Sequence, residues 1–337
     1  MEQLRNSFVG RKQTRFAVLI AVTFLALVIL QTKDVLAQPS VSSVFPRSCM
    51  PGVTTRVVVT GNGFSDPMRV VTKCEQITVE VIAVEAEQVT LEVTLPSTAP
   101  LGPLGVWLAT AAGSSDPMIL IADDLPPVAQ QAGVVSIQAA QSVPALCVVE
   151  GSSQGTHGVF FKFEVVENQR LAFEVLTHAI ESKMDPVVRL YDQDGRVLLL
   201  ADDDEIGPEC RFSYQFSTAG MYWIEVRDNR YTSGLPYLLR IGDFPIVRNA
   251  QPLALTAENV TTVAFAGQDG AASLQQSIEL PQSLSNRVTT VATRLEDGKS
   301  SAWVPILVSG KPVYQEDEAA ADTSSLKLSA HHCGKTP

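Results

Sequence analysis

The chain has 337 residues, of which 25 are basic and 36 acidic, giving a formal net charge of −11. An acidic chain with no Lys or Arg cluster on any predicted strand repels phosphate backbones, so nucleic-acid binding is disfavoured. The length exceeds one ordinary β-domain and fits two or three, and a hydrophobic content of 45% suffices for a core in each.

The first 37 residues have the pattern of a signal peptide. Basic residues precede an apolar run from Phe16 to Leu30, and Ala37 offers the small residue that signal peptidase requires. The alternative is a retained membrane anchor, but a helix over this run spans about 22 Å, less than the roughly 30 Å hydrocarbon core. We therefore predict that the mature chain begins at Gln38 and carries a net charge of −14, because cleavage removes five basic and two acidic residues. The protein would then reach the periplasm, cell surface or medium and meet the membrane only in transit.

Residues 38–123 are predicted to form the first folded unit. Short alternating runs at Arg56–Thr60, Val89–Leu95 and Leu104–Thr110 are typical of strands. The opening resembles the IPT/TIG family at Val44, Pro46, Gly52, Val57, Val59, Gly61 and Phe64. That resemblance implies an immunoglobulin-like fold, which serves as a spacer, an adhesive module or a dimerisation element.

Residues 124–144 are rich in Pro, Ala, Gln and Ser and are predicted to be a linker with one strand at Gly133–Ile137. The following segment, 145–243, contains runs in which apolar and polar side chains alternate with a period of two, as in half-buried strands. Asp194-Gly195 and Ala219-Gly220 supply the turn residues that tight hairpins need.

This second segment also contains LYDQDGRVLLLADDDE, then FSTAGMYWIEVRD and a closing YLLRIG. In that order these stretches resemble the bacterial pre-peptidase C-terminal family. The resemblance implies a small β-sandwich found on exported bacterial proteins and often appended to secreted peptidases.

Residues 244–310 carry four shorter strand-like runs and are predicted to form a weaker third β unit, whereas the polar residues 311–337 are predicted to be a disordered tail. No segment beyond the signal peptide shows a sustained helical repeat. The predicted fold is therefore all-β, with tandem β-sandwich domains.

Four cysteines allow three pairings, and proximity within the predicted domains favours Cys49 with Cys74 and Cys147 with Cys210. The alternative is that they are free buried thiols. Cys333 lies in the predicted tail and has no evident partner.

Sequence motifs for catalysis are almost absent. Gly151-Ser152-Ser153-Gln154-Gly155 matches the G-x-S-x-G nucleophile elbow, which requires a strand-to-helix turn, but a Phe-rich strand follows instead of a helix. Ser153 is therefore predicted to lie in a polar loop, and His157 to be solvated rather than a catalytic base. A serine hydrolase acting through Ser153 is the remote alternative hypothesis.

The acidic run Asp202-Asp203-Asp204 is a candidate calcium site. Ca²⁺ takes six to eight oxygen ligands, and Asp192, Asp194 or Glu209 are further candidates to supply some of them. Some members of the resembled family bind calcium. The alternative is a solvated acidic turn, because most charge runs are of that kind.

Aromatic residues offer a second candidate site. Trp223, Tyr231 and Tyr237 lie in or near the last two strands of the meander, where they would either form a binding surface or pack inward. We predict a non-catalytic exported β-module for adhesion, scaffolding or substrate presentation, with an extracellular protein or polysaccharide as partner. The alternative is an accessory, substrate-binding component of a secreted peptidase system.

Overall fold

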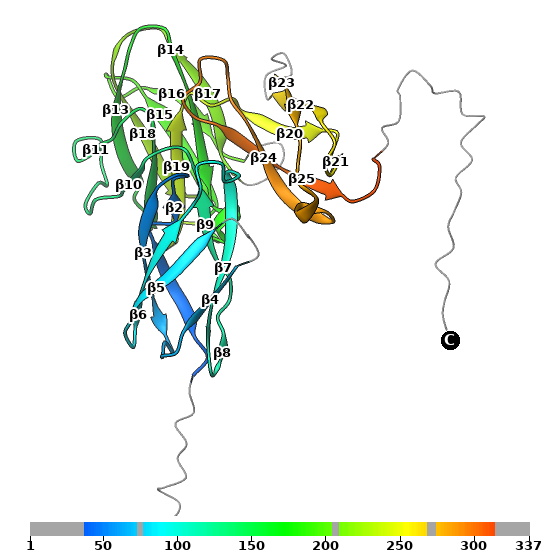
Figure 1. Ribbon diagram of the computed structural model, residues 1–337. Coiled ribbons are helices and arrows are strands. Elements are labelled where there is room, and N and C mark those ends of the chain that lie inside the picture. The colour runs from blue at the N-terminus through cyan, green and yellow to red at the C-terminus, as the bar shows by residue number, and fades with distance from the viewer. Residues whose placement is uncertain (1–36, 73–76, 204–208, 268–273, 314–337) are drawn as a thin grey trace, which may run out of the picture. The chain divides into compact units, whose positions relative to one another are not determined.

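The computed structural model describes residues 37–72, 77–203, 209–267 and 274–313 (Figure 1). Nearly all of the predicted signal peptide and most of the predicted tail lie outside these ranges. The same is true of Cys74, Asp204 and Cys333.

The described chain is built from strands, which confirms the predicted all-β fold. Its helical residues form two three-residue 3-10 turns, His178–Ile180 and Gln282–Leu284. No helix within the described ranges is both long and apolar enough to cross a bilayer. The chain divides into two compact units, one containing residues 37–99 and 103–121 and the other residues 100–102 and 122–313.

The first unit contains two sheets, one with the order β1-β3-β6-β5 and the other with the order β2-β9-β7-β4, in which β8 also pairs with β7. Their strands are β1 Ser40–Phe45, β2 Ser48–Cys49, β3 Thr54–Asn62, β4 Arg69–Thr72, β5 Thr78–Val84, β6 Gln88–Thr94, β7 Gly102–Thr110, β8 Gly113–Ser114 and β9 Met118–Ala122. Alternation along β3 and β6 buries Val57, Val59 and Leu91 completely. The IPT/TIG resemblance of this unit remains a prediction.

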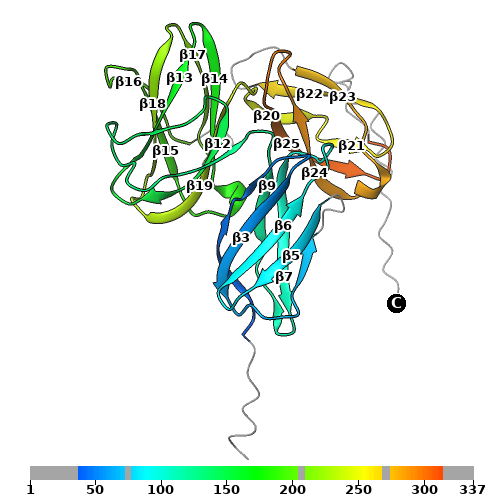
Figure 2. The ribbon, with the colours of Figure 1, turned by 60° about the vertical axis from the view of Figure 1, so that its left-hand side comes forward.

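The second unit contains a sandwich of two five-stranded sheets, with the orders β10-β12-β19-β14-β17 and β11-β13-β18-β15-β16. Figure 2 shows both sheets in green and yellow-green. Their strands are β10 Pro127–Ala129, β11 Gln141–Ser142, β12 Cys147–Gln154, β13 Val159–Val165, β14 Gln169–Leu176, β15 Pro186–Tyr191, β16 Val197–Ala201, β17 Arg211–Phe216, β18 Gly220–Asp228 and β19 Ser233–Gly242.

The core of this sandwich is aromatic. The rings of Phe173 and Phe212 stack with centroids 4.9 Å apart, and those of Phe216 and Tyr222 meet edge to face at 4.6 Å. Burying a side chain of the Phe class contributes about 1.5–3 kcal/mol, and favourable ring pairs add about 0.5–1.5 kcal/mol. The apolar positions of the period-two pattern therefore form this core.

A smaller pair of three-stranded sheets completes the second unit, with the orders β20-β22-β23 and β21-β25-β24. Its strands are β20 Val247–Gln251, β21 Ala254–Thr256, β22 Thr261–Gly267, β23 Leu274–Ile278, β24 Arg287–Thr293 and β25 Ala302–Ser309. Val263, Phe265, Val304 and Ile306 are among the buried residues of a separate small core. We refer to β20–β25 as the small sheet pair.

The predicted strand at Gly133–Ile137 is absent. Val134 contributes alone: its side chain is buried in the sandwich core and its carbonyl accepts a hydrogen bond from the Phe160 N–H at 2.8 Å. Turns follow it directly, with Ala139 N donating to Ser136 O. This segment therefore contacts the sandwich through the Val134 side chain and not through a strand. The linker pairs with the sandwich elsewhere, through β10 beside β12 and β11 beside β13.

The predicted Cys147–Cys210 disulfide is wrong, because both residues are free thiols. Cys147 lies on β12 and Cys210 directly precedes β17, so β19 and β14 separate them. Three strand spacings of about 4.8 Å exceed the roughly 7 Å that a disulfide allows between Cα atoms. The Cys147 thiol donates to Pro144 O at 3.2 Å and the Cys210 thiol to Pro186 O at 2.9 Å. The Cys49–Cys74 pairing stays a prediction, since Cys74 lies outside the described residues.

Candidate functional site

One sheet of the large sandwich, β11-β13-β18-β15-β16, turns an unusual set of side chains away from the core. Along β18, Tyr222, Ile224 and Val226 are buried in the core, so Trp223 and Glu225 between them point to the other side. Antiparallel register then places residues from neighbouring strands beside them, because directly paired side chains share one side of a sheet.

Two rows of side chains cross the strands on this outer side. The register pairs give them as Lys162, Trp223, Tyr191 and Val197 in one row and Phe160, Glu225, Arg189 and Leu200 in the other. We call these eight residues the platform. Each row takes one residue from each of β13, β18, β15 and β16.

Glu225 is the centre of the platform and is only 5% exposed. Its Oε2 accepts hydrogen bonds from the Tyr191 hydroxyl at 2.5 Å and from Arg189 Nη1 at 3.2 Å. A Cβ at position 158 would lie 2.2 Å from Glu225 Oε1, so Gly158 leaves room for the carboxylate. Burial, together with the adjacent Glu225 carboxylate, raises the pKa of Tyr191 to about 12. The phenol therefore stays protonated and holds Glu225 in place at neutral pH.

The platform combines this polar centre with apolar and aromatic surface. The rings of Phe160 and Tyr191 lie 6.2 Å apart, and Val197 and Leu200 at the edge strand are 52% and 56% exposed. The Trp223 indole N–H has no hydrogen-bond partner among the described residues. Flat aromatic surface beside fixed polar groups suits a ligand that has both apolar faces and hydroxyl groups.

Of the three aromatic residues singled out from the sequence, only Trp223 belongs to the platform. Tyr237 is 1% exposed in the sandwich core, and its hydroxyl donates to Gln130 Oε1 at 2.8 Å. Tyr231 follows β18 and lies under the Arg227 guanidinium, 5.6 Å from its centre. Sequence reasoning missed Phe160, Tyr191 and Glu225, because their meeting depends on the strand order β13-β18-β15.

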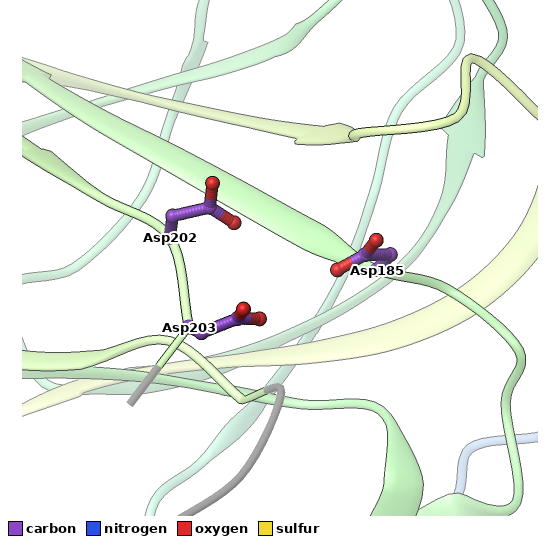
Figure 3. A group of neighbouring side chains, drawn as sticks. All are labelled: Asp185, Asp202 and Asp203. Atoms are coloured by element: carbon purple, nitrogen blue, oxygen red, sulfur yellow. The ribbon is translucent and has the colours of Figure 1, made fainter. Parts of the chain in front are cut away.

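The predicted acidic site lies elsewhere on the same sheet, where β15 begins and β16 ends. The group consists of Asp185, Asp202 and Asp203 (Figure 3). One carboxylate oxygen of each lies within 4.8 Å of the others. Asp202 and Asp203 are exposed, and Asp185 is partly buried and also 3.5 Å from Arg230 Nε. Asp204 lies outside the described residues. Three hard oxygen donors at this spacing fit a Ca²⁺ ion that keeps several water ligands.

The other suggested acidic ligands are not part of this group. Asp192 and Asp194 occupy the hairpin at the opposite end of β15, where Asp192 Oδ1 accepts from the N–H groups of Asp194 and Arg196. Glu209 Oε1 accepts from Thr177 N at 3.0 Å and Ala179 N at 3.1 Å. Asp185, by contrast, was missed by sequence reasoning.

The prediction that Ser153 lies in a polar loop is wrong, because Ser153 is part of β12; there is also no strand-to-helix turn at this position. The residue is 1% exposed, and its hydroxyl donates to Thr232 O at 2.7 Å while accepting from Leu235 N at 3.0 Å. His157 Nδ1 contacts the Thr156 hydroxyl at 3.4 Å. The G-x-S-x-G match therefore marks a buried hydrogen-bonded serine that holds β19 against β12.

Comparisons with known proteins found no matching family model and no matching curated protein. Among solved structures, the pre-peptidase C-terminal domain of a collagenase from Bacillus anthracis is 15% identical with a TM-score of 0.26, covering 30% of this chain and 92% of that one. SGBP-B from a xyloglucan utilization locus in Bacteroides uniformis is 16% identical with a TM-score of 0.19, covering 61% and 72%. The secreted serine protease VesC from Vibrio cholerae is 12% identical with a TM-score of 0.20, covering 63% and 51%.

Proposed function

We propose that this chain is a non-catalytic exported β-module that binds an extracellular polysaccharide through the platform. The observation that carries the proposal is the pair of cross-strand rows, which sets three aromatic side chains around a hydrogen-bonded carboxylate on the outer side of a sheet. Export is supported by the signal-peptide pattern of the first 37 residues.

The platform residues offer two kinds of contact to a polysaccharide, ring stacking and hydrogen bonds. The rings of Trp223, Tyr191 and Phe160 offer flat apolar surface to the C–H faces of sugar rings. Each ring has an electron-rich face, which attracts the weakly positive C–H hydrogens of a sugar. Lys162 and Arg189 flank them with donors for hydroxyl oxygens. Because the rows rest on paired strands rather than loops, little ordering is needed when the ligand binds.

We also propose that the Asp185, Asp202 and Asp203 group binds Ca²⁺. Arg230 lies beside Asp185 alone, at 3.5 Å, and a hard divalent ion would offset the repulsion among all three carboxylates. In this proposal Ca²⁺ fixes the end of β16, next to the edge of the platform, and takes no part in a reaction.

The proposal is tested by affinity electrophoresis of the purified chain in gels containing xyloglucan, mixed-linkage glucan or cell-wall polysaccharide, with a pull-down on collagen as the protein ligand. We expect retardation by a polysaccharide. Trp223→Ala should weaken it at least tenfold, which corresponds to about 1.4 kcal/mol.

Leu253→Ala is the matched control, because Leu253 is 69% exposed and lies outside the platform. Its affinity should equal that of the unmodified chain. Retention on collagen alone would replace the polysaccharide by a protein ligand, and equal losses in both variants would remove the platform from the proposal.

A further inference from the structure

The opposite outer face of the large sandwich is covered, and a buried arginine lies at its centre. Arg240 on β19 points away from the core and stands in register with Val148 and Glu174, yet it is 0% exposed. A fully buried guanidinium is costly to desolvate unless every face and donor finds a partner.

The guanidinium of Arg240 contacts three separate segments of the second unit. Asp123 Oδ2 accepts a hydrogen bond from Nε at 2.7 Å, and Asp123 Oδ1 accepts one from Nη2 at 3.1 Å. Glu174 Oε2 accepts a hydrogen bond from Nη1 at 2.7 Å. The third segment belongs to the small sheet pair, where Ser301 O accepts from Nη2 at 2.7 Å. The rings of Phe244 and Trp303 lie over the guanidinium at 4.4 and 4.0 Å.

The loop that precedes β25 is also held by carboxylates from outside the small sheet pair. Asp243 Oδ1 accepts from Lys299 N at 2.7 Å, Ser300 N at 3.1 Å and the Ser300 hydroxyl at 3.2 Å. Asp124 Oδ1 accepts from Ser301 N at 3.2 Å. Every residue of the loop 299–301 is therefore tied to the large sandwich or to the segment leading into it.

We propose that Arg240, Asp124 and Asp243 together form a clamp on the loop 299–301 that locks the small sheet pair onto the large sandwich, so that the two open as one body. The small pair has a limited core of its own and its strands are short, so contacts through the clamp supply much of its cooperativity. Without the clamp, β20–β25 open while the large sandwich stays folded.

Hydrogen exchange of the purified chain, read by mass spectrometry, tests this clamp. In the unmodified chain the amides of β24 and β25 should be protected together with those of β13 and β18. In Arg240→Met we expect β24 and β25 to exchange at least about tenfold faster. The exchange of β13 and β18 should accelerate less, although Asp123 and Glu174 both lose a charged partner. Arg196→Met is the control, because it removes the same charge from an exposed ion pair on the large sandwich and should alter neither region.

Asp243→Asn is the second variant, and it decides the outcome if Arg240→Met does not fold. It weakens the hold on Lys299 and Ser300 without leaving the buried Asp123 unpaired, and should accelerate β24 and β25 selectively. Unchanged protection of β24 and β25 in a folded variant, or equal acceleration in both regions, would overturn the proposal.

Discussion

The hydroxyl of Tyr191 donates to Oε2 of Glu225 across two neighbouring strands, and this bond organises the polar centre of the platform. Burial and the negative carboxylate both favour the neutral phenol, which is why the pKa of Tyr191 is raised to about 12. Replacing Glu225 with Gln removes the charge and keeps the shape.

We therefore expect the pKa of Tyr191 to fall in Glu225→Gln and to stay above its ordinary value of 10, because burial, the larger cause, remains. The measurement is a pH titration of the labelled tyrosine Cζ resonances by NMR. Glu164→Gln is the control, since Glu164 is an exposed residue of β13 that pairs with Met221. A Tyr191 pKa that is the same in both variants would contradict the geometry of this centre.

Calcium is expected to raise the melting temperature of the protein. A ligand at 100 times its Kd stabilises the folded state by about 2.7 kcal/mol, and the carboxylates of Asp185, Asp202 and Asp203 are the groups that would bind it. The combined change Asp202→Asn and Asp203→Asn should abolish the shift in differential scanning calorimetry. The matched pair Asp192→Asn and Asp194→Asn, in the hairpin at the other end of β15, should retain it. No shift in millimolar Ca²⁺ would eliminate the site.

The thiols of Cys147 and Cys210 should resist alkylation in the folded protein. Burial raises the pKa of Cys147 to about 12 and raises that of Cys210 as well, so neither forms the reactive thiolate at pH 8. Iodoacetamide should label both only after unfolding, as read by peptide mass spectrometry. A peptide cross-linking Cys147 to Cys210, recovered without reduction, would contradict this assignment.

Ser153 is expected to be structural. Ser153→Ala removes the acceptor of the Leu235 N–H and should lower the free energy of unfolding by about 1–3 kcal/mol, measured by urea denaturation. A fluorophosphonate probe should leave the unmodified chain unlabelled. Labelling that disappears in Ser153→Ala would restore the hydrolase interpretation.

The platform shows what a period-two pattern does and does not predict. Alternation along β18 assigns Trp223 and Glu225 to one side and Tyr222 to the other, as the structure confirms. It does not say which strands flank β18. Arg189 lies 36 residues from Glu225, on a strand that only the sheet topology places beside β18. The contact at the centre of the platform therefore could not be predicted from the sequence.

The acidic group was closer to being predictable. The turn at Asp194-Gly195 implies that β15 and β16 form a hairpin, and the register pairs Val188 with Ala201. Asp202 directly follows Ala201 and Asp185 lies three residues before Val188, so both are at the same end of the hairpin, whereas Asp192 and Asp194 lie at its turn. The disulfide prediction failed for a related reason, because proximity along the chain ignores the strands that topology inserts between two positions.

The two platform rows run at right angles to their strands, and this direction constrains the shape of a ligand. Neighbouring strands are about 4.8 Å apart, so successive side chains in each row are spaced at that interval over four strands, a length of about 14 Å. A linear chain whose chemical repeat is close to this interval stays in phase with the sheet along its whole length. A branched or compact molecule contacts the side chains of only one or two strands in a row.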